Sequence, residues 1–373
     1  MTSIRRTGLA LGCATAALLA LGPVQGRALD LAPDKVGTEA EFQDIKQFCG
    51  TKPIRVALSD GWGGNTWRKT ARAEFEDEAA KCPNITQVAY TDAGGNPEQQ
   101  IQDIQSLTAQ GYDVILVSFD FVQSNLRAMQ AARRAGASVV LYNTGTTLPA
   151  KLGVNYDSRV TLDLEAEGKL WGEWAVKYLH GKGNVLPFGG TPGAQPTLSY
   201  REGWQPVFDA NPDIKVLQDP VVTNWDPAQY TSATSALLGK YDHIDLLLSD
   251  YITGVMGAVR AFQNAGRPLV AVTGVDANEV HCFYEDVKDK EPGFQFLTLS
   301  GGTWQTRLAL RKGLAHHNGI DDTEPSIIEP TVIADSLSDD PELAPHCDRD
   351  LPMDASFGSS YLSREAFKAM LGQ

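Results

Sequence analysis

The sequence lacks a hydrophobic run long enough to cross a membrane. Its most apolar segment, residues 8–22, is shorter than the roughly 20 residues that a transmembrane helix needs. Arg5 and Arg6 precede this segment and Pro23 follows it, which is the layout of a secretory signal peptide. The sequence therefore predicts a signal peptide over residues 1–28 and a soluble mature protein that is exported.

Two alternatives concern the export signal. A lipid anchor at Cys13 is disfavoured, because the apolar stretch before it is short and Ala10 stands where lipoprotein signals usually carry leucine. The pair Arg5-Arg6 also raises the twin-arginine pathway, but the neighbouring residues fit that signal weakly. The export route stays open.

Basic residues are few. The chain has 32 Lys and Arg against 46 Asp and Glu, a formal net charge of −14. Such a charge repels nucleic acid and anionic membrane surfaces, and no basic cluster with interleaved aromatic residues is found. We therefore expect no nucleic-acid partner.

Cysteine is scarce as well. Beyond Cys13 in the leader there are Cys49, Cys82, Cys282 and Cys347, without the closely spaced Cys or His ligands of a zinc site. We expect no metal. An even number of cysteines in an oxidising compartment predicts two disulfides. Their positions favour Cys49 with Cys82, fastening an N-terminal lead to the first βα unit, and Cys282 with Cys347, fastening the tail, although four cysteines allow three pairings.

Motifs of catalysis and cofactor binding are missing too. The sequence contains no dinucleotide fingerprint, no phosphate-binding loop and no nucleophile elbow. His316 and His317 are adjacent on an expected helix and cannot share one face. We therefore expect no cofactor and no enzyme. The alternative from another class is a periplasmic glycoside hydrolase with paired carboxylates such as Asp92 and Asp276.

What the sequence does have is a regular alternation of strand and helix patterns, which is typical of βαβ units on a parallel sheet. Apolar runs predict strands at 54–58, 85–90, 114–119, 138–142, 184–188, 214–222, 244–249, 269–275 and 294–300. Helical patterns lie near 66–81, 97–110, 121–135, 161–179, 198–210, 227–239, 253–265, 278–288 and 303–317. Nine parallel strands are too many for one sheet, and so many elements exceed what one hydrophobic core usually organises. The sequence predicts an α/β protein of two similar doubly wound parallel-sheet domains with a ligand cleft between them.

Polar and aromatic side chains follow many of the expected strands. After residues 54–58 the chain turns through Ser-Asp-Gly-Trp-Gly-Gly and then presents Asn65, Trp67 and Arg68. An indole face beside hydrogen-bonding groups suits a ring that is apolar on its faces and hydroxylated at its rim, as a sugar is. Because ligands bind at the carboxyl ends of strands in open α/β sheets, we expect a sugar site here. The alternative is that Trp67 is a core residue of the first helix.

Five segments carry a resemblance to a known family. They are residues 91–104 (TDAGGNPEQQIQDI), 111–118 (GYDVILVS), 135–140 (AGASVV) and 257–266 (GAVRAFQNAG) followed by 272–276 (VTGVD). In this order they resemble the type I periplasmic solute-binding proteins, most of all the ribose-binding branch that serves sugar ABC importers, over roughly residues 52–335. Bacterial regulators with the same fold begin with a helix-turn-helix, whereas this chain begins with an export signal.

The resemblance implies two lobes that close on a sugar or polyol. It places a lead at 29–50, an N-terminal lobe at 51–156 plus 301–330, and a C-terminal lobe with the tail at 157–300 plus 331–373. Crossings near 156, 301 and 330 would form a three-segment hinge. The protein would act in the periplasm as a monomer and deliver its ligand to the membrane permease of an ABC importer.

The resemblance also implies binding residues. Trp67 would stack on the sugar, Trp225 would close over it from the other lobe, and Asp276 would grip hydroxyl groups through charge-assisted hydrogen bonds. The full implied set is Asn65, Trp67, Arg68, Ser118, Asn143, Tyr156, Arg201, Trp225, Asp250, Asp276 and Ser300.

Some positions depart from the family pattern. Tyr200 stands where the family often has arginine, with Arg201 one place later, and Asp250 and Tyr251 compete for one role. Arg68 and Asn143 would move the pocket toward positive charge. A sugar acid or other anionic polyol is therefore the alternative to the preferred neutral ligand.

Overall fold

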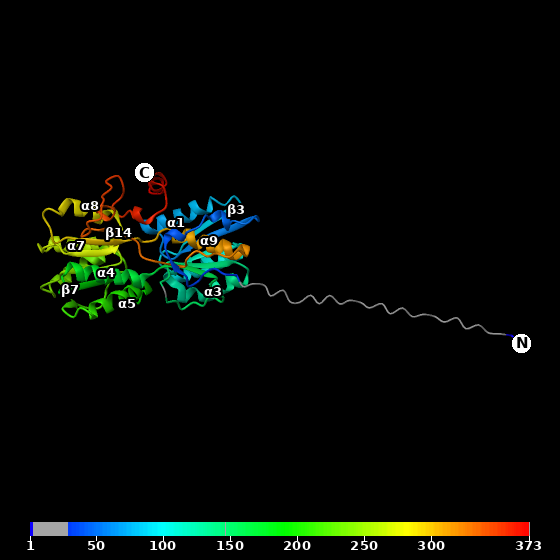
Figure 1. The fold of residues 1–373 in the computed structure, drawn as a ribbon, viewed down its shortest axis with the longest axis horizontal. Coiled ribbons are helices and arrows are strands. Elements are labelled where there is room, and N and C mark those ends of the chain that lie inside the picture. The colour runs from blue at the N-terminus through cyan, green and yellow to red at the C-terminus, as the bar shows by residue number, and fades with distance from the viewer. Residues whose placement is uncertain (3–28, 146, 373) are drawn as a thin grey trace.

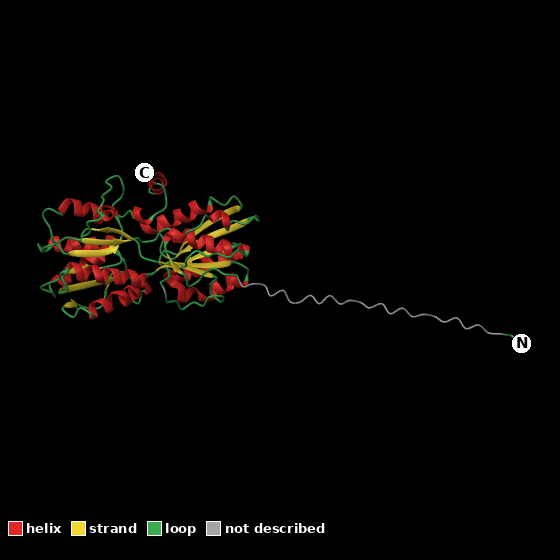
Figure 2. Cartoon of the chain, viewed as in Figure 1, coloured by secondary structure: helices red, strands yellow, loops and turns green. Residues whose placement is uncertain are grey.

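The computed structural model describes residues 1–2, 29–145 and 147–372 of the 373-residue chain. Except for its first two residues, the predicted signal peptide lies outside the described residues. The chain from residue 29 onward forms two α/β lobes side by side, each with one central sheet covered by helices (Figures 1 and 2).

The first lobe is built on a parallel sheet in the order β1-β13-β6-β5-β4-β2-β3. The strands are β1 Val36–Gly37, β2 Ile54–Asp60, β3 Ile85–Asp92, β4 Val114–Ser118, β5 Ser138–Tyr142, β6 Ser158–Leu162 and β13 Ile327–Ile328. Its helices are α1 Thr66–Ala79, α2 Pro97–Ala109, α3 Val122–Arg134 and α9 Gln305–Asn318.

The second lobe has the order β14-β12-β11-β10-β7-β8, with β9 also paired to β7 and β14 antiparallel to β12. The strands are β7 Gly183–Gly189, β8 Ile214–Val216, β9 Val221–Val222, β10 Leu246–Leu248, β11 Ala271–Val275, β12 Phe296–Leu299 and β14 Val332–Asp335. Its helices are α4 Leu164–Tyr178, α5 Gln195–Asp209, α6 Pro227–Leu238, α7 Ile252–Asn264 and α8 Asn278–Val287. The predicted fold class is confirmed.

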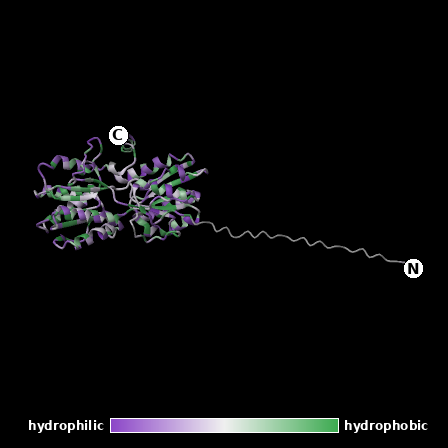
Figure 3. Ribbon diagram, in the orientation of Figure 1, coloured by the Kyte–Doolittle hydropathy of each residue, from purple (hydrophilic) through white to green (hydrophobic). Residues whose placement is uncertain are grey.

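The central strands are buried on both faces. Every residue of β4 (VILVS) and β5 (SVVLY) is buried, since helices cover both sides of a parallel sheet. Figure 3 shows apolar segments, in green, inside both lobes. This is why continuous apolar runs, rather than alternating ones, marked the strands in the sequence.

Two local predictions were wrong. The expected helix from residue 161 begins only with α4, because Ser158–Leu162 forms β6, which pairs with β5 and β13. The expected strand over 214–222 is divided into β8 and β9, with Pro220 between them. Proline has no N–H to donate to a neighbouring strand, so it interrupts the pairing.

The position of β6 also moves the first crossing between the lobes. It was expected near residue 156 but follows β6, so residues 158–162 belong to the first lobe. The other two crossings lie between β12 and α9 and between β13 and β14. The tail is not confined to the second lobe either: Phe367 of the last helix, α10 (Arg364–Met370), packs near Ala73 of α1.

The two predicted disulfides are present, Cys49 with Cys82 and Cys282 with Cys347. The first joins the lead to the end of α1, and the second joins α8 to the tail. In the part of the chain that the structure describes, every helix is too short or too polar to traverse a lipid bilayer.

Candidate functional site between the lobes

A cavity of about 660 Å³ lies between the two lobes. It is lined from the first lobe by the segments after β2, β4 and β5, and from the second lobe by those after β7, β9, β10 and β11. These are carboxyl ends of strands, where open α/β sheets bind ligands. The volume is in the range of small-molecule sites, roughly 300–1,000 Å³.

Most of the residues implied by the resemblance line this cavity. They are Asn65, Trp67, Arg68, Asn143, Trp225, Asp250 and Asp276. One of them also has a structural role: the side-chain oxygen of Asn65 caps α1 by accepting a hydrogen bond from the backbone N–H of Arg68 at 2.8 Å.

The two indoles are held from opposite sides of the cleft. Nε1 of Trp67 donates to the carbonyl oxygen of Gly301 in the second crossing, at 2.9 Å. Nε1 of Trp225 donates to Oδ2 of Asp250 at 3.1 Å. Both indoles are half-buried, so each lobe supplies an aromatic side chain whose polar edge is already bonded.

The backbone around Trp225 and the space beside its ring hold the indole at the cavity. Asn224 and Trp225 have φ angles of 51° and 52°, in the left-handed region that non-glycine residues rarely adopt. A Cβ on Gly190 would lie 2.2 Å from the Trp225 ring, so only glycine leaves room for the indole. Strained backbone that a structure retains is often found at functional sites.

Arg68 does not make the pocket positive, contrary to the prediction from the sequence. Its guanidinium lies 2.9 Å from Oδ1 of Asp60 and 2.6 Å from Oδ1 of Asp120. Burial by itself lowers the pKa of Arg68, but Asp120 and Asp60 outweigh burial and hold the pKa above its usual value. The charge of Arg68 is therefore already balanced by two carboxylates.

The second lobe adds two more carboxylates. Burial raises the pKa of Asp250 to about 6, although the hydrogen bond from Trp225 opposes this, and its buried Oδ1 accepts no hydrogen bond from the described residues. Oδ1 of Asp276 lies 2.6 Å from Nε2 of His281 and 3.1 Å from Oγ1 of Thr298. With both groups on Oδ1, the second oxygen of Asp276 is left for other partners.

Comparison with known proteins agrees with this geometry. Residues 56–284 match the family described as periplasmic binding protein domain. The chain belongs to this family. The family resemblance inferred from the sequence is confirmed.

Named relatives of this periplasmic binding protein are distant. It is 29% identical to the galactofuranose-binding protein YtfQ of Escherichia coli K12, over 44% of this chain and only 51% of that protein. It is 25% identical to the xylitol-binding protein of Mycolicibacterium smegmatis, over 72% of this chain and 74% of the relative. The chain therefore matches about half the length of the first relative.

Solved structures share the fold. A crystal structure of a galactofuranose binding protein has a TM-score of 0.66 at 22% identity, covering 75% of this chain and 94% of the other. The Caulobacter myo-inositol binding protein bound to myo-inositol also has a TM-score of 0.66, at 23% identity, covering 76% and 94%.

Four residues implied by the resemblance do not line the cavity of this periplasmic binding protein. Two of them lie in the first lobe. Ser118 is buried, and its hydroxyl accepts a hydrogen bond from the N–H of Gly61 and donates to Oδ2 of Asp120 at 2.7 Å. Tyr156 is buried in a hydrophobic cluster under the sheet. Ser118 ends β4 as expected, but its side chain does not face the cavity. Tyr156 was expected at a strand end of the second lobe, whereas it precedes β6 of the first lobe.

The other two lie in or next to the second lobe. Arg201 points away from the cleft to exposed Asp219 at 3.0 Å, whereas the neighbouring Tyr200 lines the cavity. Successive residues of a helix point in different directions. The sequence alone therefore does not tell which of Tyr200 and Arg201 faces the cleft. The hydroxyl of buried Ser300 accepts a hydrogen bond from the N–H of Gly302 at 3.2 Å.

The carboxylate pair considered for a glycoside hydrolase is not assembled. Asp276 lines the cavity but Asp92 does not. Oδ1 of Asp92 instead accepts hydrogen bonds from the N–H groups of Gly63 at 2.9 Å and Gly94 at 2.8 Å. Asp92, the last residue of β3, thus holds neighbouring turns of the first lobe.

Tyr251, the alternative to Asp250 in the sequence, lines the cavity as well. The implied set left out several other lining residues, namely Trp62, Asp120, Phe121, Asp354 and Ser356. The ring centroids of Trp62 and Phe121 lie 6.4 Å apart, so the two form an aromatic rim on the first lobe. Asp120 had a visible signal, since it follows the end of β4. Asp354 and Ser356 belong to the tail and had none.

Proposed function

We propose that this protein captures a neutral sugar or polyol in the cleft between its lobes and delivers it to the membrane permease of an ABC importer. The observation that carries the proposal is one cavity lined by an indole from each lobe, Trp67 and Trp225, together with the carboxylates of Asp250 and Asp276. Flat aromatic faces suit the apolar faces of a sugar, and carboxylates accept hydrogen bonds from its hydroxyl groups.

Charge favours a neutral ligand over a sugar acid. The guanidinium of Arg68 is bonded to Asp60 and Asp120, while the second lobe contributes two further carboxylates to the cavity. An anionic ligand would meet net negative charge, and among the described residues that line the cavity the cation, Arg68, is already paired. The names of the relatives, galactofuranose-binding and xylitol-binding, are consistent with neutral ligands.

Capture would occur by closure. A ligand that contacts both lobes favours the state in which they approach, and the three crossings would act as hinges. The protein would work after export to the periplasm, as a monomer and as a binding protein rather than an enzyme, without cofactor or nucleic acid. Membership of the periplasmic binding protein family supports the permease and the compartment in this proposal.

A thermal-shift screen of the mature protein tests the proposal, because a ligand that binds only the folded state raises the melting temperature. The panel contains D-ribose, D-xylose, D-galactose, xylitol, myo-inositol and D-glucuronate. We expect a shift with a neutral compound that is lost in Trp67→Ala and retained in part by Trp67→Phe. A shift with D-glucuronate alone would contradict the neutral assignment. No shift with any compound would contradict the sugar or polyol assignment.

A further inference from the structure

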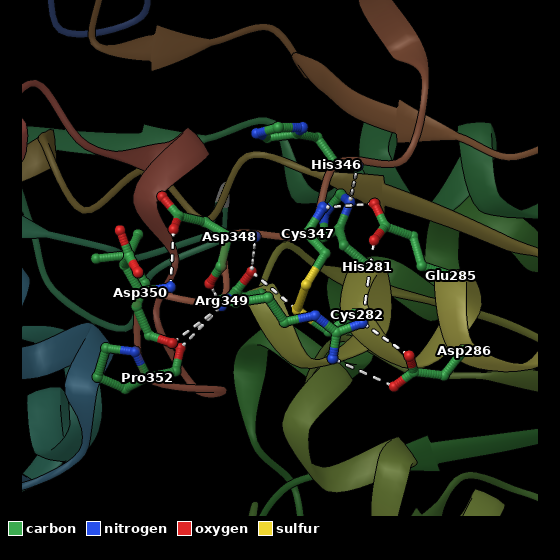
Figure 4. The surroundings of a disulfide bond; sticks show 12 residues. His281, Cys282, Glu285, Asp286, His346, Cys347, Asp348, Arg349, Asp350 and Pro352 are labelled. Carbon is green, nitrogen blue, oxygen red and sulfur yellow. Dashed lines mark hydrogen bonds and ion pairs between the residues drawn. A yellow bond between two sulfur atoms is a disulfide. The ribbon is translucent and has the colours of Figure 1, made fainter.

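The C-terminal tail connects the two lobes a fourth time. After β14 it is fastened to α8 by the disulfide between Cys282 and Cys347, and Figure 4 shows the surrounding contacts. The side chain of Asn278, at the start of α8, donates to the carbonyl oxygens of Asp348 at 2.7 Å and Leu351 at 3.2 Å. Its Oδ1 accepts from the N–H of Asp348 at 2.9 Å. This end of the tail is therefore fixed to the second lobe.

The tail then passes to the first lobe. The carboxylate of Asp354 accepts a hydrogen bond from the hydroxyl of Thr66 at the start of α1. Farther along, buried Glu74 of α1 accepts hydrogen bonds from the hydroxyl of Ser360 at 2.6 Å and from the N–H of Tyr361 at 2.7 Å. In Figure 1 the end of the chain, in red, lies above the junction of the lobes.

Between these attachments the tail also covers the second crossing. The N–H of Gly301 donates to the hydroxyl of Ser359 at 2.8 Å. A Cβ on Gly358 would lie 3.2 Å from Oδ2 of Asp276. The tail backbone therefore passes directly beside the Asp276 carboxylate that lines the cavity. The tail is thus in contact with the site and with the hinge.

Asp354 is placed where the tail spans the cleft. It lines the cavity together with Ser356, and its side chain is exposed. Its Oδ2 is bonded to Thr66, and within the described part of the chain its Oδ1 accepts no hydrogen bond. Its charge also reaches the second lobe: burial raises the pKa of Tyr251, and Asp354 raises it further. Asp354 therefore presents an acceptor to the cavity between α1 and α7.

We propose that the tail is a wall of the ligand site, in which Asp354 accepts a hydrogen bond from a hydroxyl group of the bound sugar or polyol and Thr66 positions it. This rests on the function proposed above. The family match ends at residue 284, so the tail contributes a contact from outside the matched domain. A ligand held in this way would contact both lobes and the element that bridges them, which favours the closed state.

Titration calorimetry on the full mature protein tests this, with the compound of the neutral panel that binds the wild type most tightly as probe. We expect Asp354→Ala to weaken binding about tenfold, as for loss of a hydrogen bond to a charged group, and Asp354→Asn to weaken it less because an acceptor remains. Asp339→Ala is the matched control, since Asp339 is an exposed carboxylate of the same tail before the disulfide. It should leave the Kd unchanged.

The positioning role of Thr66 has its own test. Thr66→Val removes the hydroxyl that holds Asp354 and should weaken binding about threefold. Thr66→Ser keeps the hydroxyl and should have a Kd close to that of the wild type. Melting temperatures without ligand report whether each variant is folded. An unchanged Kd in folded Asp354→Ala would overturn this inference alone. A wild type that binds none of the compounds would overturn the proposed function and this inference with it.

Discussion

Oδ1 of Asp276 lies 2.6 Å from Nε2 of His281, whose Nδ1 accepts a hydrogen bond from the backbone N–H of His346 at 3.0 Å. Because Nδ1 is an acceptor, the proton of the neutral ring is on Nε2, which donates to Asp276. His346 precedes the tail cysteine of the second disulfide. The tail therefore orients, through one imidazole, the carboxylate proposed to bind ligand hydroxyl groups.

Removal of this imidazole should reduce ligand affinity. We expect His281→Ala to weaken binding of the tightest panel compound about tenfold, because Asp276 loses the donor that fixes its orientation. His281→Gln, whose amide nitrogen takes the place of Nε2, should recover part of the loss. Titration calorimetry measures both, and equal affinities for His281→Ala and the wild type would contradict the positioning role.

Loss of Arg68 should affect the stability of the fold. Arg68→Ala leaves buried Asp60 without its cationic partner, so we expect the free energy of unfolding to fall by about 3 kcal/mol. Arg72→Ala is the control on the same helix: its pair with Glu76 is exposed and should contribute less than about 1 kcal/mol. Urea unfolding followed by tryptophan fluorescence measures both. Equal small losses would show that the cluster around Arg68 is not a stabilising unit.

Asp250 should make stability depend on pH. Its pKa of about 6 in the folded state exceeds the usual value near 4, so between these pH values the folded state binds more protons than the unfolded state. The contribution of Asp250 to the free energy of unfolding therefore falls as pH rises from 4 to 6. Relative to wild type, Asp250→Asn should gain on the order of 2 kcal/mol across this window.

Urea unfolding at pH 4, 5, 6 and 7 measures this difference. Asp339→Asn, at an exposed carboxylate, should follow the wild type at each pH. A constant difference between Asp250→Asn and the wild type over the whole range would show that Asp250 titrates normally.

The two disulfides should differ in their effect on binding. By loop entropy, removal of either one should lower the free energy of unfolding by on the order of 4 kcal/mol. Only Cys282→Ser with Cys347→Ser should also raise the Kd, because it releases the tail that holds His281 and Asp354. The disulfide between Cys49 and Cys82 lies away from the cleft, so Cys49→Ser with Cys82→Ser is the matched control. Calorimetry at a temperature where both variants are folded distinguishes them, and unchanged affinity in both would contradict the role of the tail.

Local sequence patterns determined the secondary structure and the fold class of this protein. The apolar run of residues 114–118 became β4, and the Asn-Pro pair before residue 98 became the capped start of α2, because burial and capping act on residues close in sequence. The alternation of such segments was sufficient for the fold class. An even number of cysteines behind a predicted export signal was sufficient to expect two disulfides. The carboxyl ends of the strands located the cleft.

Only the tertiary structure decided which groups meet in that cleft. Arg68 became the cation of a cluster with two carboxylates because Asp120, 52 residues away, reaches it beside Asp60. Residues 158–162 became a strand because β5 and β13 lie on either side. Asp354 entered the site through a contact with Thr66 across 288 residues. Periodicity reports the face on which a residue lies, whereas pairing of charges and placement of a tail depend on distances between segments that the local sequence does not contain.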